Sequence, residues 1–182
     1  MIKTDRLLLR SWREEDLDPL AQLNTDPMVM EFLPAPLTRE ESRARLELYN
    51  QHIREHGWGL WAVSAPGLSN FIGWIGLWPI GFDAHFTPAV EVGWRLLPKF
   101  WAQGYATEGA RASLAYGFNT LNLDEIVSVT VPANLRSIRV MEKLGMHCDP
   151  KDDFNHPKFP EGHPLSRHVL YRIKKSEWLE RI

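Results

Sequence analysis

Residues 90–146 constrain the fold of this chain most, because they combine strand, turn and helix signals in one continuous order. The apolar run Val90–Leu96 predicts a strand, and Gly104 then allows the sharp turn with which a helix opens. The next strand is expected at Ile126–Val131, which consists almost entirely of β-branched residues. Asn134 follows as the cap of another helix. Two strands connected through a helix predict a mixed sheet with helices packed against it.

The flanking segments add strands and helices to the same sheet. Further strands are predicted at Leu7–Leu9, at the hairpin formed by Leu60–Val63 and Phe71–Leu77, and at His168–Ile173. Helices are predicted after two capping boxes, Ser11–Glu14 and Thr38–Glu41, whereas the Pro-rich segment 149–164 predicts a loop. Because the chain holds no repeat, low-complexity tract or linker, residues 1–182 are expected to form a single α/β domain with about four helices.

The charge balance and the apolar runs exclude several classes of partner. Lys and Arg together number 21 and Asp and Glu 23, which gives a net charge of −2 and argues against a nucleic acid. No run approaches the roughly 20 apolar residues that cross a bilayer, and the N-terminus does not resemble a signal peptide. We therefore expect no membrane partner and a cytoplasmic location, with which the single cysteine, Cys148, is compatible.

The glycine turn before the helix is typical of an anion site. The first N–H groups of a helix lack intrahelical partners and carry partial positive charge, so a pyrophosphate fits there. The spacing Gly104-x-Ala106-x-x-Gly109 superficially resembles a dinucleotide fingerprint. That fingerprint requires an acidic residue beyond the next strand, but Asp124 and Glu125 precede it. A phosphate loop of the Walker type is excluded as well, since no Gly-Lys-Ser/Thr follows.

Two motifs carry a specific family resemblance. The first is Val92–Pro98 followed by Trp101–Glu108, and the second is Asn134–Met146. Their order and spacing resemble the acyl-CoA-binding motifs of the GCN5-related N-acetyltransferase (GNAT) superfamily, in the branch of the ribosomal-protein N-terminal acetyltransferases. The resemblance implies a GNAT-like single-domain fold, in which a central mixed, splayed β-sheet is flanked by helices. It also implies acetyl-CoA as co-substrate and direct attack of a primary amine on the thioester.

The resemblance further implies where acetyl-CoA binds. Its pantetheine arm is expected between the two splayed strands, its pyrophosphate at the N–H groups of residues 103–107, and its nucleotide end near Lys143. The implied cofactor residues are Leu96, Leu97, Trp101, Ala102, Gln103, Gly104, Tyr105, Ala106, Thr107, Asn134, Ser137 and Lys143. Two positions depart from the family pattern. Trp101 stands where Gln or Arg is frequent, and Met141 stands where many relatives carry a Tyr that protonates the leaving thiolate.

Acetyl transfer to an amine requires a base, because an alkyl ammonium is mostly protonated at neutral pH. Glu91 is the candidate, since its position between two valines predicts partial burial and a raised pKa. The alternative is that Glu91 faces solvent or pairs with Arg95. Ser137 is the candidate acid toward the thiolate, with Tyr105 as an alternative, and Ser137 is also expected in the cap network of Asn134.

Histidines, acids and tryptophans suggest further functional roles, each of which has a structural alternative. His147, Cys148, His156, His163 and His168 match no compact zinc spacing, so we predict no metal. His156 and His163 are expected in a loop over the substrate cleft, and His168 as a buried, hydrogen-bonded residue. Glu31, Asp83 and His85 are candidates to border the acceptor site, although surface positions are the simpler interpretation. Core positions are the default for the tryptophans, with some expected in the cleft.

The sequence thus predicts an acyl-CoA-dependent N-acyltransferase that moves acetyl to a primary amine. The acceptor is a small-molecule amine or a protein N-terminus, and the sequence does not choose between them. A homodimer formed by sheet-edge pairing stays open. The alternatives are a non-catalytic acyl-CoA-binding sensor or interaction protein, which the missing Tyr at position 141 favours, and a metal-dependent hydrolase.

Overall fold

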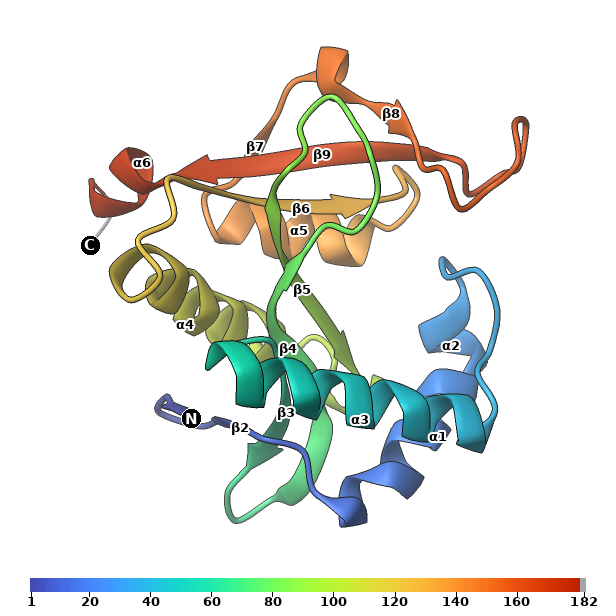
Figure 1. The fold of residues 1–182 in the computed structure, drawn as a ribbon, viewed down its shortest axis with the longest axis vertical. Coiled ribbons are helices and arrows are strands. Elements are labelled where there is room, and N and C mark those ends of the chain that lie inside the picture. Colours follow the sequence, from blue (N-terminus) through green and yellow to red (C-terminus); the bar gives the residue numbers. More distant parts are fainter. Residues whose placement is uncertain (181–182) are drawn as a thin grey trace.

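The chain folds around one long sheet whose two halves diverge in the middle (Figure 1). This computed structural model describes residues 1–180. The strand order is β1-β2-β3-β4-β5-β6-β9-β7, and β8 pairs with β9 outside this path. The strands are β1 (Ile2–Lys3), β2 (Leu8–Arg10), β3 (Leu60–Ala65), β4 (Ser69–Pro79), β5 (Val90–Leu96), β6 (Glu125–Thr130), β7 (His147–Cys148), β8 (Phe154–Asn155) and β9 (Arg167–Lys174).

Six α-helices accompany the sheet in the described part of the chain. They are α1 (Leu17–Thr25), α2 (Pro27–Met30), α3 (Arg39–His56), α4 (Tyr105–Asn119), α5 (Leu135–Lys143) and α6 (Lys175–Leu179), and short 3-10 turns lie at Glu14–Asp16, Pro98–Phe100 and Pro150–Asp152. The sequence predicted about four helices, and these correspond to the four longer helices α1, α3, α4 and α5. The short α2 and α6 were missed because four or five residues are too few to show a helical apolar period.

The divergence of the sheet lies between β5 and β6. Along β5, seven residues pair with β4 in antiparallel register, from Gly73 opposite Leu96 to Pro79 opposite Val90. On the other side, β5 meets β6 in parallel at a single pair, Glu91 opposite Val127. Strand β6 pairs with β9 along its whole length. The two halves of the sheet are therefore joined at one point, and the predicted mixed, splayed sheet is confirmed.

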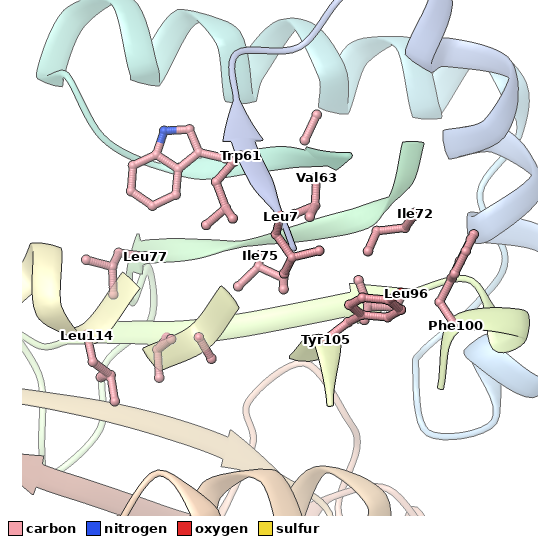
Figure 2. Close-up of a cluster of buried hydrophobic side chains, with 14 of the residues drawn as sticks. Leu7, Trp61, Val63, Ile72, Ile75, Leu77, Leu96, Phe100, Tyr105 and Leu114 are labelled. Carbon is pink, nitrogen blue, oxygen red and sulfur yellow. The ribbon is translucent and has the colours of Figure 1, made fainter. Parts of the chain in front are cut away.

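Helix α4 covers one face of the sheet at close range. A Cβ atom on Gly109 would lie 2.4 Å from Ile75 Cδ1, so a larger residue at this position would force the Ile75 side chain to shift. Ile75, Leu114 and Trp61 are fully buried in the resulting core (Figure 2). Burial of such side chains contributes about 1.5–3 kcal/mol each, so this face fixes α4 and the turn that precedes it.

Helices α1 and α3 cover the opposite face, where aromatic side chains dominate. Tyr49 of α3 contacts the rings of Trp74 and Trp78 of β4, with centroids 6.4 and 5.5 Å apart. Trp12 donates its indole N–H to the carbonyl of Leu60 at 2.7 Å. The wall next to β5 on this side is thus built from aromatic rings held by α3.

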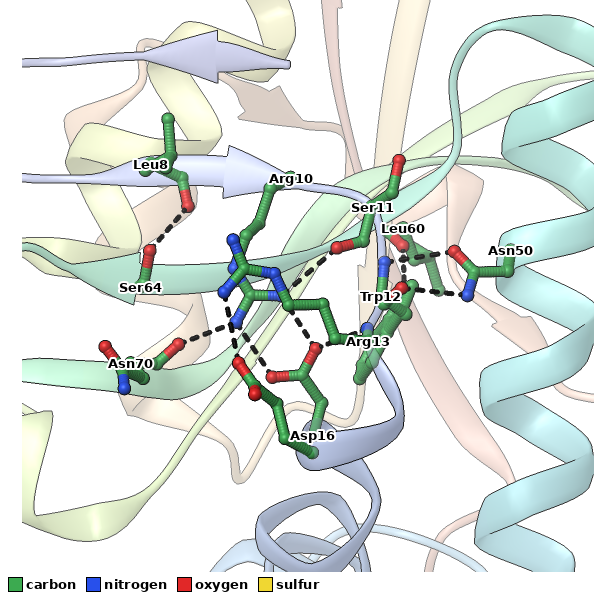
Figure 3. A network of polar contacts seen from close by, with 11 residues as sticks. Leu8, Arg10, Ser11, Trp12, Arg13, Asp16, Asn50, Leu60, Ser64 and Asn70 are labelled. Atoms are coloured by element: carbon green, nitrogen blue, oxygen red, sulfur yellow. Dashed lines mark hydrogen bonds and ion pairs between the residues drawn. The ribbon is translucent and has the colours of Figure 1, made fainter.

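A buried ion pair fixes the start of α1 to β2 (Figure 3). Arg10 Nη1 and Nη2 donate to the two carboxylate oxygens of Asp16 at 2.7 and 2.8 Å, and Nη2 also donates to the Asn70 carbonyl at 2.7 Å. Asp16 accepts the backbone N–H of Arg13 as well, at 2.8 Å. The predicted capping box Ser11–Glu14 is therefore wrong, because the carboxylate of Asp16 caps this turn instead.

The second predicted capping box is confirmed at the start of α3, and it gives a stability prediction. Thr38 Oγ1 accepts the N–H of Glu41 at 3.1 Å, and Glu41 Oε2 accepts the N–H of Thr38 at 2.7 Å. Thr38→Ala should lower the free energy of unfolding by about 1 kcal/mol, because one helix-start N–H loses its acceptor. Urea denaturation measures the change, and Thr38→Ser, which keeps the hydroxyl, is the control. Equal stability of the alanine and serine variants would contradict the capping role.

Candidate active site

The point where β5 and β6 separate opens into a cleft of about 790 Å³. Residues of α2, β4, β5, α4, β6, α5 and β9 line it. The single Glu91–Val127 pair lies where the strands still touch, and the cleft widens from there toward the N-terminus of α4. Such a gap between strands leaves main-chain N–H and C=O groups of β5 and β6 open to a ligand.

The start of α4 forms a main-chain cradle at one end of the cleft. Gly104 has a φ of +83°, which suits glycine, and precedes the first helical residue, Tyr105. The first backbone bond of the helix runs from the N–H of Glu108 to the carbonyl of Gly104 at 2.9 Å. Within residues 1–180, the N–H groups from Gly104 to Thr107 have no protein acceptor. Unpaired N–H groups at a helix start fit the pyrophosphate of acetyl-CoA.

Arg6 holds the cradle in place from the first turn of the chain. Its Nη1 donates to the Gln103 carbonyl at 2.9 Å, and its Nε donates to Glu108 Oε2 at 2.6 Å. The guanidinium also lies 4.6 Å from the ring centroid of Tyr105. These contacts fix the turn. Further cations line the cleft from α5, namely Arg136, Arg139 and Lys143.

Most of the predicted cofactor residues line this cleft. They are Leu96, Trp101, Ala102, Gly104, Tyr105, Ala106, Thr107, Asn134, Ser137 and Lys143. The side chains of Leu97 and Gln103 do not. Leu97 is buried in the core, and the exposed side chain of Gln103 donates its amide to the Lys99 carbonyl at 2.8 Å, outside the cleft.

Trp101, one of the two departures from the family pattern, forms a wall of the cleft. Its indole N–H donates to the Leu96 carbonyl at the end of β5, at 2.7 Å. The guanidinium of Arg136 lies 4.7 Å from its ring centroid. Arg136 in turn pairs with Glu31, just after α2, at 2.5 Å. Trp101 thus connects the end of β5 to α5, and this connection does not require the Gln or Arg that is frequent at this position in the family.

Glu91 lies where the two strands part, with its carboxyl group toward β6. Its Oε1 accepts the N–H of Val129 at 3.3 Å. Burial raises the pKa of Glu91 to about 7, and the Val129 N–H opposes this rise. The alternative pairing with Arg95 is wrong, because Arg95 donates to Asn24 Oδ1 at 2.9 Å instead. A carboxyl group with a pKa near neutrality in a cleft has the properties of a general base.

Asn134 and Ser137 form a small polar unit at the start of α5. Asn134 Oδ1 accepts the N–H of Ser137 at 3.3 Å, which confirms the predicted cap. Asn134 Nδ2 donates to Thr130 Oγ1 at 3.0 Å and to Ser137 Oγ at 3.1 Å. Because Ser137 accepts from Asn134, its own O–H proton is left for another acceptor in the cleft. Met141, one turn further along α5, is buried and also lines the cleft.

Two neutral histidines close the other side of the cleft. The ring centroids of His156 and His168 lie 4.9 Å apart. Burial lowers the pKa of both, to about 4 for His156, whose Nδ1 accepts the N–H of Lys158. His168 is buried and hydrogen-bonded to the Ser166 carbonyl, as predicted, but it also lines the cleft. Within residues 1–180, no three His, Cys, Asp or Glu residues are grouped to hold a metal.

The sequence missed some lining residues and suggested others that lie elsewhere. None of the three candidates for the acceptor site, Glu31, Asp83 and His85, lines the cleft. Glu31 forms an ion pair with Arg136, and His85 lies 3.6 Å from Asp152. Missed lining residues include Arg95 and Phe159, besides the paired Arg136. Alternation along β5 could have found Arg95, since residues two and four positions after Glu91 share its face.

Comparison with known proteins identifies the family. The family described as an acetyltransferase (GNAT) domain matches residues 6–147. The chain belongs to the GNAT acetyltransferase family. The predicted fold and acetyl-CoA-dependent acetylation of an amine are thereby confirmed at the level of the family.

Individual GNAT relatives cover nearly the whole chain. The FsC-acetyl coenzyme A-N(2)-transacetylase of Aspergillus fumigatus is 34% identical over 98% of this chain and 77% of its own length. The crystal structure of a GNAT-family acetyltransferase from Bacillus anthracis superposes with a TM-score of 0.79, at 29% identity over 97% of this chain and 99% of that one. A spermidine N-acetyltransferase from Vibrio cholerae, solved with CoA and spermine, shares the fold with a TM-score of 0.74 and 23% identity, over 97% and 99% of the two chains.

Among residues 1–180, no helix has both the length and the apolar character that a bilayer span requires.

Proposed function

We propose that this chain acetylates the primary amine of a small molecule, with Glu91 as the general base. The observation that carries the proposal is the position of the Glu91 carboxyl group, at the point where β5 and β6 part and with a pKa near 7. At neutral pH such a group is partly ionised and can accept the proton of an ammonium, directly or through a water.

Acetyl-CoA would lie along the gap between β5 and β6. The N–H groups of Gly104 to Thr107 would bind its pyrophosphate, and the open edges of the two strands would pair with its pantetheine arm. Lys143 lines the cleft on the α5 side, where a cation suits the nucleotide phosphates. The bound thioester supplies the activated acetyl group. The chain's own part is to orient it beside Glu91 and to keep bulk water away from both.

Ser137 is proposed as the group that stabilises the leaving thiolate. Its hydroxyl proton is not used by Asn134, and Met141 provides no proton at the position where relatives carry Tyr. Ser137→Ala should lower kcat by about 10- to 100-fold, the usual range for one hydrogen bond to a charged group. Steady-state kinetics with excess acetyl-CoA measures the effect, and Ser137→Thr, which keeps the hydroxyl, is the control. An unchanged kcat in the alanine variant would remove Ser137 from the mechanism.

A small acceptor is favoured over a protein N-terminus. The Glu31–Arg136 ion pair joins the residue after α2 to α5 beside the cleft, and we infer that it narrows the approach of a large partner. Small molecules are also named for relatives, such as spermidine for an Escherichia coli acetyltransferase that is 28% identical. For the branch of the ribosomal-protein N-terminal acetyltransferases, we propose a likeness only in the two cofactor-binding motifs, and not in the acceptor.

A polyamine is disfavoured as the acceptor by the charges of the cleft. Glu91 is the one carboxylate among the described lining residues, whereas several Arg and Lys side chains face the cleft. A second ammonium group would therefore lack a counter-charge and meet repulsion. The proposed acceptor carries one amine and a neutral or anionic remainder.

The test is a screen of primary amines with acetyl-CoA, in which released free CoA is measured with and without acceptor. Turnover that depends on an amine supports the proposal. Tight binding of acetyl-CoA without turnover of any amine would contradict it and favour a non-catalytic sensor. We also propose that residues 1–182 form one domain that acts in the cytoplasm. Sedimentation analysis would determine whether it is a monomer or a homodimer.

A further inference from the structure

One face of β5 presents two charged groups to the acceptor side of the cleft. Glu91, Gly93 and Arg95 alternate onto this face, opposite Trp78, Gly76 and Trp74 of β4. The Arg95 guanidinium lies 5.2 Å from the ring centroid of Trp74. Both Glu91 and Arg95 line the cleft, with Gly93 between them. The strand therefore holds a base and a cation side by side along one wall.

Among the described residues, Arg95 has no carboxylate partner. Its one side-chain hydrogen bond within residues 1–180 runs from Nη1 to Asn24 Oδ1 at 2.9 Å, and it forms no salt bridge there. Asn24 is buried and donates its own amide to Ser42 Oγ at 3.0 Å. A neutral amide thus orients the guanidinium without neutralising it.

The surroundings of Arg95 make this lack of an anion unusual. Burial lowers the pKa of Arg95, and the charge of Arg45 lowers it further. The hydroxyl of Tyr49 is a further titratable neighbour of Arg95, and burial raises its pKa, which favours its neutral form. Buried charges in proteins are normally paired, so a cation left free in a ligand cleft points to an anion that arrives with the ligand.

We propose that Arg95 binds a carboxylate of the acceptor, so that the acceptors of this enzyme are amino carboxylates. The inference rests on the proposed function and adds the class of substrate. The guanidinium presents parallel N–H groups that match the two oxygens of a carboxylate, and Trp74 fixes its plane. The acceptor amine then lies toward Glu91 and its carboxylate toward Arg95.

The spacing on β5 suggests the length of the acceptor. Arg95 lies four positions after Glu91 on β5, which corresponds to about 13 Å between their Cα atoms at about 3.3 Å per residue. Gly93 contributes no side chain to the wall between them, and the Trp74 ring lies there instead, 3.4 Å from where a Cβ atom on Gly93 would be. A linear acceptor with several carbons between amine and carboxylate fits this span better than glycine does.

The first experiment compares three matched series of acceptors. They are ω-amino carboxylates from glycine to 8-aminooctanoate, alkylamines of the same chain lengths, and the corresponding α,ω-diamines. We expect the amino carboxylates to have the highest kcat/KM, by at least 10-fold over alkylamines at the best length, and the diamines the lowest. Equal or better turnover of alkylamines or diamines at every length would overturn the proposal while leaving the acetyltransferase function in place.

Two variants test the role of Arg95 itself. Arg95→Gln should reduce the ratio of kcat/KM for the best amino carboxylate to that for its alkylamine by about 10- to 100-fold, the usual effect of hydrogen bonds to a charged group. Asn24→Asp keeps Arg95 and its shape but supplies the missing carboxylate, so it should reduce the same ratio. An equal loss for both acceptors in both variants would show that Arg95 is merely structural.

A binding measurement keeps the proposal testable if no amine in these series is acetylated. Hexanoate, which has no amine, should bind the CoA-saturated protein in calorimetry, and Arg95→Gln should weaken this binding by at least 10-fold. Saturation with CoA blocks the cations at the cofactor end. Binding of hexanoate without amine turnover would contradict the proposed function alone, whereas no difference between wild type and Arg95→Gln would contradict the carboxylate site.

Discussion

Glutamine in place of Glu91 is expected to lower kcat by about 10²- to 10⁴-fold, the usual contribution of a positioned general base. The substitution keeps the size of the side chain and the acceptor oxygen for the N–H of Val129, but it removes the ability to take a proton. The Kd for CoA should change little, because Glu91 lies at the opposite end of the cleft from the cradle. Glu142→Gln, on the exposed surface of α5, is the matched control.

The pH profile separates a base from a structural role for Glu91. Because the pKa of Glu91 is about 7, kcat of the wild type should rise as pH increases through that value and the carboxylate forms. The Glu91→Gln variant should lack this rise and keep only the limb that belongs to the acceptor amine. Full turnover across pH in the variant, or an unchanged rise near pH 7, would remove Glu91 as the base.

Stability against pH supplies the folding control for the same variant. The folded-state pKa of Glu91 lies above its ordinary value of 4.5, so its contribution to stability is fully present below about 4.5 and is lost as pH rises through about 7. Glutamine carries no such charge. Glu91→Gln should therefore be at least as stable as the wild type at pH 8, so a loss of activity there cannot be ascribed to unfolding.

The cofactor half of the site could be predicted because its signals are local. Gly104 is needed for a turn with positive φ, and Asn134 caps the helix that follows β6. Alternation along β5 predicts that Glu91 faces away from Val92, and in the structure Val92 is buried in the core whereas Glu91 lines the cleft. Each of these assignments depends on residues within one strand, turn or helix end, so the sequence alone contains the information.

The acceptor half could not be predicted in the same way, because it depends on contacts between distant segments. The Glu31–Arg136 pair joins residues 105 positions apart, and the Asn24–Arg95 bond joins residues 71 positions apart. His168 lies in the predicted strand β9, but His156 beside it comes from the segment before β9, which shows no helical or strand period. The Ser11–Glu14 capping box failed for a related reason, since the buried Arg10–Asp16 pair competes for the same turn.

The second large expected effect is a loss of cofactor binding in Ala106→Glu, a substitution in the cradle at the start of α4. Ala106 lies in the first turn of α4 and lines the cleft. A carboxylate in the first turn of a helix is compatible with the helix, because it interacts favourably with the unpaired N–H groups and the dipole. The variant should therefore fold. Its carboxylate, however, carries the same charge as the pyrophosphate and reaches for the same N–H groups.

Calorimetry should show a Kd for CoA at least 100-fold higher in Ala106→Glu than in wild type. A hydrogen bond to a charged group contributes about 1.5–3 kcal/mol, so the loss of one or two such bonds together with the repulsion accounts for this factor. Ala106→Ser, which is small and neutral, should bind CoA as the wild type does. Acetyl-pantetheine, which lacks the pyrophosphate, separates charge from shape. As an acetyl donor it should have similar kcat/KM values in the glutamate and serine variants, whereas an equal loss with both donors would mean that the substitution distorts the cleft rather than occupying an anion site.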